Sequence, residues 1–265
     1  MRLSPLISSY EQFVVDLDGT VYVGEELTPG AGEAIEALRG AGKGVAFVTN
    51  NPRLSSEDYV RKLWKLGVKA SLGDVVTVGG ATQHLLAETR SGRTAFVIGS
   101  PAIQQHVTEA GLRVMNGTDL ASRAEVVLVA GTDQIDYDDL RTATLAVRRG
   151  ADFLATSRDP TYPMPDGMWP GTGALLAAVE TAAERTAATI GKPEPQLMIT
   201  AMDRLGDART LVIGDRLDTD GAAAAGAKVD FALVLSGGAT QDEVDRAKSV
   251  KPVAVAETLA KLVAP

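Results

Sequence analysis

Two aspartates two residues apart, Asp16 and Asp18, follow an apolar run and come directly before a glycine. Alternate residues of a strand lie on the same face, so we expect both carboxylates to project together where the strand ends. In open α/β sheets, ligands bind at this edge. Paired carboxylates there can bind a metal ion, attack phosphorus or transfer a proton. A strand-to-turn junction with two solvated acids would give the same pattern.

Three further polar clusters favour the chemical interpretation. Thr49-Asn50-Asn51 ends a second apolar run, and Asp215, Asp218 and Asp220 follow a later one. Lys192 stands between a glycine and a proline, just before a predicted helix. If the strands are parallel, all these clusters meet along one sheet edge. Four such clusters in one chain are hard to explain as turn chemistry alone.

Only a few kinds of reaction use this combination of side chains. Several carboxylates packed together raise one another's pKa, and a divalent cation removes that problem. Oxygen ligands without cysteine favour Mg²⁺ over zinc. Lys192 would offset the charge of a phosphate, and Thr49 would donate a hydrogen bond to it. An aspartate can attack phosphorus to give an acyl phosphate, and its neighbour two residues on can protonate the leaving oxygen and then activate water.

Composition excludes several classes of function. The chain has 265 residues and no cysteine, so it has no disulfide, thiol nucleophile or thiolate metal site. A net charge of −8 without a basic run argues against nucleic-acid binding. The apolar stretches are too short to span a bilayer, and no secretory signal is recognised. Two histidines make a Ser-His-Asp hydrolase a poor fit. We expect a cytoplasmic protein without membrane or nucleic-acid partners.

Strand-like and helix-like segments alternate along the chain and must position these clusters. This alternation predicts an α/β fold with a parallel sheet. Helices are expected from the cap pair Thr28-Pro29, after the cap residue Ser55, near Leu140, and over 173–183 and 195–205. Strands are expected over residues 13–18, 44–49, 94–98, 125–129, 152–155, 211–214 and 230–235.

One connection, residues 156–173, is unusually long and holds four prolines. Connections of that length in a compact domain are usually functional, and prolines would stiffen this one. We therefore expect it to lie near the functional site.

The ordered motifs resemble those of the haloacid dehalogenase superfamily of phosphotransferases. The similarity runs from about residue 12 to 240, and within the superfamily it is greatest to the NagD-type, p-nitrophenylphosphatase-like branch. That branch includes phosphoglycolate, glycerol-3-phosphate, pyridoxal-phosphate and nucleotide phosphatases. The motifs are Asp16-Leu17-Asp18-Gly19-Thr20, Val48-Thr49-Asn50-Asn51, Gly191-Lys192-Pro193-Glu194-Pro195 and the segment from Gly214-Asp215 to Asp220.

The resemblance implies a Rossmann-like core formed by residues 1–79 and 187–265, with a large α/β cap (C2-type) inserted over 80–186. It also implies roles for the motif residues. Asp16 would be the nucleophile and Asp18 the general acid and base. Mg²⁺ would be held by the Asp16 carboxylate, the Asp18 main-chain carbonyl and Asp215. The phosphoryl group would be held by Thr49, Asn50 and Lys192. Asp220 would orient a water or a neighbouring ligand, and Asp218 is better explained as a helix N-terminal charge.

One stretch departs from the pattern of the relatives. They often read Ala-Thr-Asn-x-Asp where this chain has Ala155-Thr156-Ser157-Arg158-Asp159. Arg158 could meet a second anionic group of the substrate or be an ordinary surface arginine. We take Arg158 and Asp159 as the candidate substrate-specificity residues.

We therefore predict a Mg²⁺-dependent phosphomonoesterase that forms an aspartyl-phosphate. Its partner would be a small phosphorylated metabolite: phosphoglycolate, glycerol 3-phosphate, a sugar phosphate or a nucleoside monophosphate. A phosphotransferase or phosphomutase and a non-catalytic binding protein on the same fold are alternatives, and a D-x-D glycosyltransferase would leave Lys192 and Asp215 without a role. The cap could also mediate a homodimer.

Overall fold

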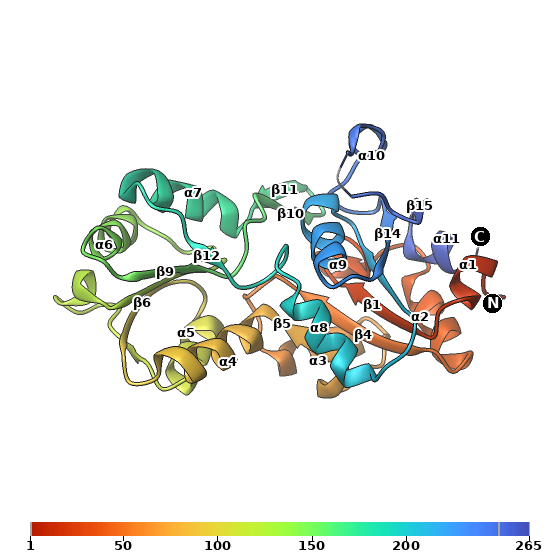
Figure 1. The fold of residues 1–265 in the computed structure, drawn as a ribbon, viewed down its shortest axis with the longest axis horizontal. Helices are drawn as coiled ribbons and strands as arrows, with labels where there is room; N and C mark the ends of the chain where they lie inside the picture. The colour runs from red at the N-terminus through yellow and green to blue at the C-terminus, as the bar shows by residue number, and fades with distance from the viewer. Residues whose placement is uncertain (1, 249, 265) are drawn as a thin grey trace.

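Two separate parallel sheets divide the chain into two lobes that lie side by side (Figure 1). The structure, a computed structural model, describes residues 2–248 and 250–264. Both chain ends lie in the first lobe, as Figure 1 shows. The alternation of strands and helices inferred from the sequence is confirmed, and so is the expected α/β class.

The sheet of the first lobe is buried on both faces, which explains its nearly continuous apolar strands. Along β1, Phe13 and Val15 pack in one apolar cluster and Val14 in another, because alternate residues point to opposite faces. All six strands are parallel, in the order β15 (Ala254–Ala256), β14 (Asp230–Val234), β13 (Thr210–Gly214), β1 (Gln12–Asp16), β4 (Gly44–Thr49) and β5 (Val75–Thr77).

Helices cover both faces of this sheet. One face packs against α1 (Pro5–Ser8), α2 (Ala31–Gly40), α3 (Ser56–Lys65) and α11 (Leu259–Val263). The other face packs against α8 (Gln196–Leu205) and α9 (Ala222–Gly226). The remaining elements of this lobe are the short helix α10 (Gln241–Arg246), the 3₁₀ turn η1 (Leu72–Asp74) and the π-helical turn η3 (Leu217–Gly221).

The second lobe is a five-stranded parallel sheet, also covered on both faces. Its strand order is β12 (Ala188–Thr189), β9 (Asp152–Ala155), β8 (Val126–Val129), β6 (Thr94–Ile98) and β7 (Arg113–Val114). Its helical elements are α4 (Val78–Arg90), α5 (Pro101–Glu109), α6 (Tyr137–Arg148), α7 (Thr172–Ala183) and the turn η2 (Ala121–Arg123). Since β12 belongs to this sheet, we infer that the inserted segment ends at Thr189 rather than at residue 186. None of the helices in the described ranges combines the length and apolar character that crossing a membrane requires.

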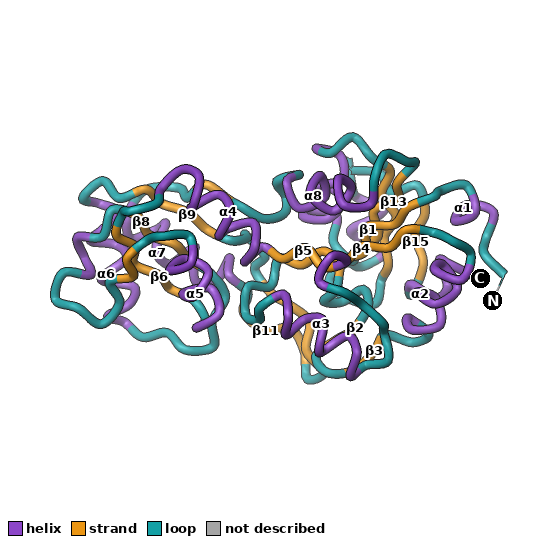
Figure 2. Tube along the Cα trace, turned by 90° about the horizontal axis from the view of Figure 1, so that it is seen from below, coloured by secondary structure: helices purple, strands orange, loops and turns teal. Residues whose placement is uncertain are grey.

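Two short antiparallel hairpins approach each other between the lobes. The long proline-rich connection forms one of them, β10 (Thr161–Met164) and β11 (Gly167–Pro170), for which no strands were predicted. Each strand of a two-stranded sheet is an edge strand, and edge strands tolerate proline, so Pro163 and Pro170 fit there. The other hairpin, β2 (Tyr22–Val23) and β3 (Glu26–Leu27), turns at Gly24, where an added Cβ would lie 2.8 Å from Pro165 Cδ. Figure 2 shows the same two-lobed arrangement from below.

Two predicted boundaries are corrected. The first strand ends at Asp16 rather than Asp18, because the backbone turns over Leu17, whose carbonyl accepts from the Val21 amide (2.9 Å). Thr28 is not a helix cap: its hydroxyl donates to the Thr20 carbonyl at 2.8 Å, and α2 begins at Ala31. The Ser55 cap is confirmed, since its hydroxyl accepts from the Asp58 amide at 3.1 Å.

One apolar cluster contains residues of both lobes, and Leu86 of α4 lies fully buried in it. We expect Leu86→Ala to lower the free energy of unfolding by about 2–5 kcal/mol, because a buried leucine leaves a cavity. Urea unfolding followed by circular dichroism measures the change. Leu145→Ala on α6 is the matched control: its side chain is 39% exposed, and we expect a loss under about 1 kcal/mol. Equal losses would contradict the packing role of Leu86.

Candidate active site

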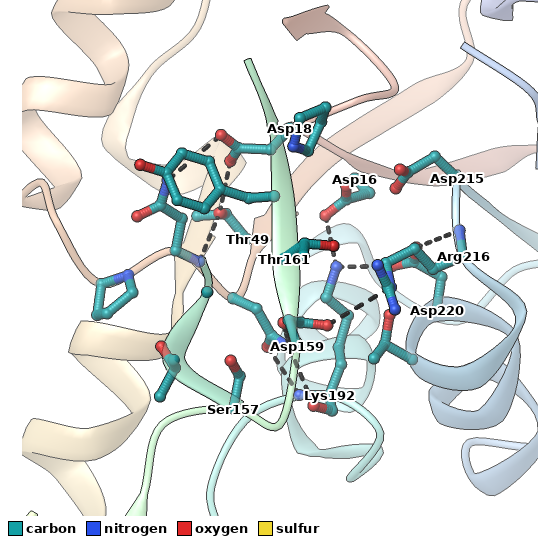
Figure 3. Close-up of a pocket in the computed structure, with 18 of the residues that line it drawn as sticks. Asp16, Asp18, Thr49, Ser157, Asp159, Thr161, Lys192, Asp215, Arg216 and Asp220 are labelled. Carbon is teal, nitrogen blue, oxygen red and sulfur yellow. Dashed lines mark hydrogen bonds and ion pairs between the residues drawn. The ribbon is translucent and has the colours of Figure 1, made fainter. Parts of the chain in front are cut away.

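The polar clusters found in the sequence meet in one small cavity between the lobes (Figure 3). Strands β13, β1 and β4 are neighbours in the sheet, so Asp215, Asp16 and Thr49 lie side by side at its carboxyl edge. Lys192 enters from the segment that follows β12. The cavity has a volume of about 60 Å³, enough for a few water molecules or a group of phosphoryl size.

A buried ion-pair network forms the centre of the cavity. Lys192 Nζ lies 2.5 Å from Asp16 Oδ1 and 2.6 Å from Asp220 Oδ1, and all three side chains are less than a tenth exposed. Asn50 holds the lysine backbone from both sides: the Lys192 amide donates to Asn50 Oδ1 at 2.8 Å, and Asn50 Nδ2 donates to the Lys192 carbonyl at 2.9 Å. Hydrogen bonds between buried ionised groups are strong, so this geometry is well fixed.

The negative charge of the buried carboxylates is only partly neutralised by Lys192. Burial raises the pKa of Asp16 well above its usual value; the attraction of Lys192 opposes this rise, and repulsion from Asp220 and Asp215 adds to it. Burial, with repulsion from Asp220, raises the pKa of Asp215 to about 7. Although burial disfavours the ammonium, Asp16 and Asp220 hold the pKa of Lys192 above its usual value. Three buried carboxylates around one ammonium therefore leave a surplus of negative charge.

This surplus and the donor atoms fit a divalent cation. Asp16, Asp215 and Asp220 each offer an oxygen, and the three oxygens lie within 4.8 Å of one another. A Cβ added at Gly19 would lie 2.5 Å from Asp215 Oδ2, so the Asp18–Gly19 backbone passes directly beside this carboxylate. An all-oxygen donor set with excess negative charge is what Mg²⁺ prefers.

Asp220 is held more tightly than the other acids of the cluster. One oxygen receives the Lys192 ammonium, and the other accepts from the Arg216 amide at 3.2 Å. With both oxygens engaged, Asp220 is suited to orienting its neighbours, as expected from the sequence. Asp218 does not line the cavity and pairs with the Arg216 guanidinium at 3.0 Å.

Asp18 faces the cavity and is held by the loop that follows β4. Thr49 Oγ1 donates to Asp18 Oδ2, and Asn51 Nδ2 donates to Asp18 Oδ1, both at 3.3 Å. Asn51 is itself fixed by the Tyr59 hydroxyl on its carbonyl (2.7 Å) and by the Arg53 amide on its side chain (3.2 Å). Asp18 is therefore oriented by two donors while it stays partly accessible.

Asn50 connects this centre to the second lobe. Its Nδ2 also donates to Asp159 Oδ2 at 2.9 Å. Burial raises the pKa of Asp159, although Lys192 and the Asn50 hydrogen bond oppose the rise. The side chain of Asn50 thus holds Lys192 and Asp159, and contact with a phosphoryl group through its backbone amide stays a prediction.

Arg158 is not brought to the cavity. Its guanidinium makes a paired contact with Glu180 at 2.8 and 3.2 Å and donates to the Ala187 carbonyl at 2.9 Å. Of the two interpretations of Arg158 that the sequence left open, this placement favours the one without a substrate contact, since Arg158 does not line the cavity. Its neighbour Asp159 does line the cavity, because consecutive side chains leave an extended segment on opposite sides.

Several residues that line the cavity were not predicted from the sequence, and Arg53, Tyr162 and Arg216 are the largest of them. Arg53 pairs with Asp133 at 3.0 Å and lies over the Tyr162 ring, 4.3 Å from its centre. Arg53 and Arg216 each lie within three residues of a motif aspartate or asparagine in the sequence. This proximity was the only signal that could have marked them as lining residues. Nothing local marked Tyr162, whose place depends on the unpredicted hairpin.

Comparisons with known proteins agree with the geometry. A model of haloacid dehalogenase-like hydrolases matches residues 13–113, and a related HAD-hydrolase-like model matches residues 189–262. The chain is 34% identical over 248 residues to an acid sugar phosphatase of Staphylococcus saprophyticus, covering 93% of this chain and 94% of that protein.

Solved structures are similar over nearly the whole chain. A glycerol phosphate phosphatase of Mycobacterium tuberculosis, crystallised with magnesium, is 33% identical with a TM-score of 0.87, covering 99% of this chain and 79% of that one. A 4-nitrophenylphosphatase of Thermotoga maritima is 30% identical with a TM-score of 0.85, covering 98% of both chains.

The last residue of β13, Gly214, leaves room for Asp220: an added Cβ would lie 2.3 Å from Asp220 Cγ. We expect Gly214→Ala to lower the free energy of unfolding by at least about 2 kcal/mol, because it overpacks the site and strains the Lys192–Asp220 pair. Urea unfolding is the measurement. Gly40→Ala is the control, since nothing lies within 4 Å of its added Cβ and α2 should gain slightly. A Gly214 variant as stable as the control would contradict this close approach.

Proposed function

The chain belongs to the haloacid dehalogenase-like hydrolases and is a phosphatase of this family, and we propose that it hydrolyses small phosphate esters with Mg²⁺ through an aspartyl-phosphate on Asp16. The observation that carries the proposal is the placement of Asp16. Its carboxylate is buried, lines the cavity, and lies 2.5 Å from Lys192 and beside Asp215. A nucleophile in that position meets the phosphorus with its charge partners already in place.

In the first step, an oxygen of Asp16 attacks phosphorus and the bond to the leaving oxygen breaks. Asp18 gives its proton to that oxygen, so the product leaves as an alcohol. In the second step, Asp18 takes a proton from water, whose oxygen attacks the same phosphorus. Inorganic phosphate leaves, and the carboxylate of Asp16 is restored.

The remaining residues stabilise charge. We assign the ion to Asp16, Asp215 and the Asp18 carbonyl, with Asp220 orienting them. A bound Mg²⁺ would neutralise the surplus negative charge and act as a Lewis acid on the phosphoryl group. Lys192 and Thr49 would contact the phosphoryl oxygens, where charge develops in the transition state.

The relatives suggest the classes of substrate to test. They are named acid sugar phosphatase, glycerol phosphate phosphatase and 4-nitrophenylphosphatase, and we propose sugar phosphates and glycerol phosphate as the first candidates. Phosphoglycolate and nucleoside monophosphates complete the panel. Every residue that the proposed chemistry requires is present: Asp16, Asp18, Asp215, Asp220 and Lys192. There is therefore no reason to favour a binding protein over an enzyme.

Asp16→Asn should lower kcat for p-nitrophenyl phosphate by at least about 10³-fold, because the amide cannot attack phosphorus. Release of nitrophenol and circular dichroism measure turnover and folding. Asp218→Asn is the matched control, since this carboxylate is 66% exposed and outside the cavity, and it should keep most activity. Acid quenching with radiolabelled substrate should trap a phosphoenzyme in the parent only. Near-normal turnover or a phosphoenzyme in Asp16→Asn would refute the nucleophile.

Saturating Mg²⁺ should raise the melting temperature by about 5–10 °C, since a ligand at 100 times its Kd stabilises by about 2.7 kcal/mol. Differential scanning fluorimetry at constant ionic strength measures the rise. Asp215→Asn should lose most of this increment. Without metal, the same variant should be at least as stable as the parent, because one repelling buried charge is removed. An undiminished increment in Asp215→Asn would contradict the proposed ligand.

A further inference from the structure

The geometry points to Tyr59 as a positioning residue for Asp18: its hydroxyl holds Asn51, and Asn51 in turn orients the Asp18 carboxylate. This inference rests on the proposed function, in which Asp18 transfers the proton. Tyr59 belongs to α3 and does not line the cavity. It would therefore act on the reaction only through the loop that follows β4.

The side-chain amide of Asn51 has one favourable orientation. Its Oδ1 accepts from the Arg53 backbone amide at 3.2 Å, so its Nδ2 is left to donate to Asp18 Oδ1 at 3.3 Å. An ionised carboxylate can only accept, which fits this orientation. The Asn51 backbone amide also donates to Thr49 Oγ1 at 3.0 Å, which leaves the Thr49 hydroxyl proton for Asp18 Oδ2. Both donors on Asp18 thus depend on where the Asn51 backbone lies.

The Tyr59 hydroxyl fixes that backbone. It donates to the Asn51 carbonyl at 2.7 Å, and the side chain is only 1% exposed. Burial raises the pKa of this hydroxyl, and among the surrounding charges Asp18 contributes most to the rise. Tyr59 packs in the same apolar cluster as Phe47 of β4. A hydroxyl carried by a packed ring cannot follow a moving loop, so its bond restrains Asn51.

The contacts of the neighbouring loop residues lead to the second lobe instead. Pro52 accepts from the Ser100 hydroxyl, and the Arg53 guanidinium pairs with Asp133. Asp18, Asn51 and Tyr59 all belong to the first lobe. The bond from Tyr59 therefore gives the Asn51 backbone a support that does not involve the second lobe.

The test uses two esters of nearly the same shape, phenyl phosphate and p-nitrophenyl phosphate. Phenol is the weaker acid and the poorer leaving group, so its ester depends more on the proton from Asp18. Tyr59→Phe should lower kcat/KM for phenyl phosphate by about tenfold, a part of the roughly 10²–10⁴-fold typical of acid–base catalysis. The loss for p-nitrophenyl phosphate should stay below about threefold. Inhibition by inorganic phosphate should be unchanged, because Lys192 and Thr49 remain in place.

Two other buried tyrosines provide matched controls. Tyr10 precedes β1, at the opposite edge of the sheet, and donates to Asp230 Oδ2 at 2.6 Å. Tyr10→Phe loses a comparable bond, so its melting temperature should fall similarly while the ratio of kcat/KM for the two esters stays that of the parent. The Tyr22 hydroxyl is buried and lacks a partner in the part of the chain that the structure describes. Burial and the charge of Asp18 raise its pKa, yet Tyr22→Phe should also keep the ratio. An unchanged ratio in Tyr59→Phe, or an equal change in a control, would overturn the inference.

Nuclear magnetic resonance separates this inference from the proposed function, because it requires no turnover. The side-chain amide signal of Asn51, assigned with Asn51→Asp, should shift in Asp18→Asn, since the two side chains are in contact. In the Tyr59→Phe background, the same substitution should shift the signal by less than about half as much, because coupled residues are not additive. That result supports the role of Tyr59 even if the parent hydrolyses neither ester. Equal shifts in both backgrounds would contradict it.

Discussion

One buried ammonium group holds this site together. Lys192 Nζ lies between the carboxylates of Asp16 and Asp220, at 2.5 and 2.6 Å. Removing ions from water costs several kcal/mol each, so buried pairs of this kind contribute little net stability. Their value is positional: Lys192 holds Asp16 and Asp220 together, and its charge opposes the burial that raises the pKa of Asp16, at the point where we propose that a phosphoryl group binds. The surplus of acid beyond that one cation leaves the site suited to a metal ion.

Much of this site could be predicted because its signals are local. Asp16, Thr49 and Asp215 each end or follow an apolar strand, and parallel packing alone brings strand ends together. Lys192 is 176 positions from Asp16 in sequence, so its place beside that residue depends on the whole topology, although the sequence already put it among the clusters expected to meet at one sheet edge. Arg158 and Asp159 show where local reasoning ends. Which of two adjacent side chains faces the cavity is set by contacts with Glu180 and α7 that no sequence period encodes.

The second lobe contacts the candidate active site through the loop that follows β4. The Ser100 hydroxyl donates to the Pro52 carbonyl at 3.0 Å, and Asp133 binds the Arg53 guanidinium. The same loop supplies Asn51, which orients Asp18. The second lobe therefore contacts the loop that orients Asp18, the residue proposed to transfer the proton. The hairpin β10–β11, which was not predicted from its proline-rich sequence, adds a further contact, because the ring of Tyr162 packs against the guanidinium of Arg53.

Asn50 joins the second lobe to the centre of the site. Its carbonyl oxygen accepts from the Lys192 amide, while its amino group donates to the Lys192 carbonyl and to Asp159. Asn50, which holds Lys192 beside the proposed nucleophile Asp16, thus also holds one oxygen of Asp159. The two bonds between Asn50 and the Lys192 backbone do not involve Asp159, so the position of Lys192 does not depend directly on this contact with the second lobe. That separation would let one core chemistry serve different alcohols through changes confined to the second lobe.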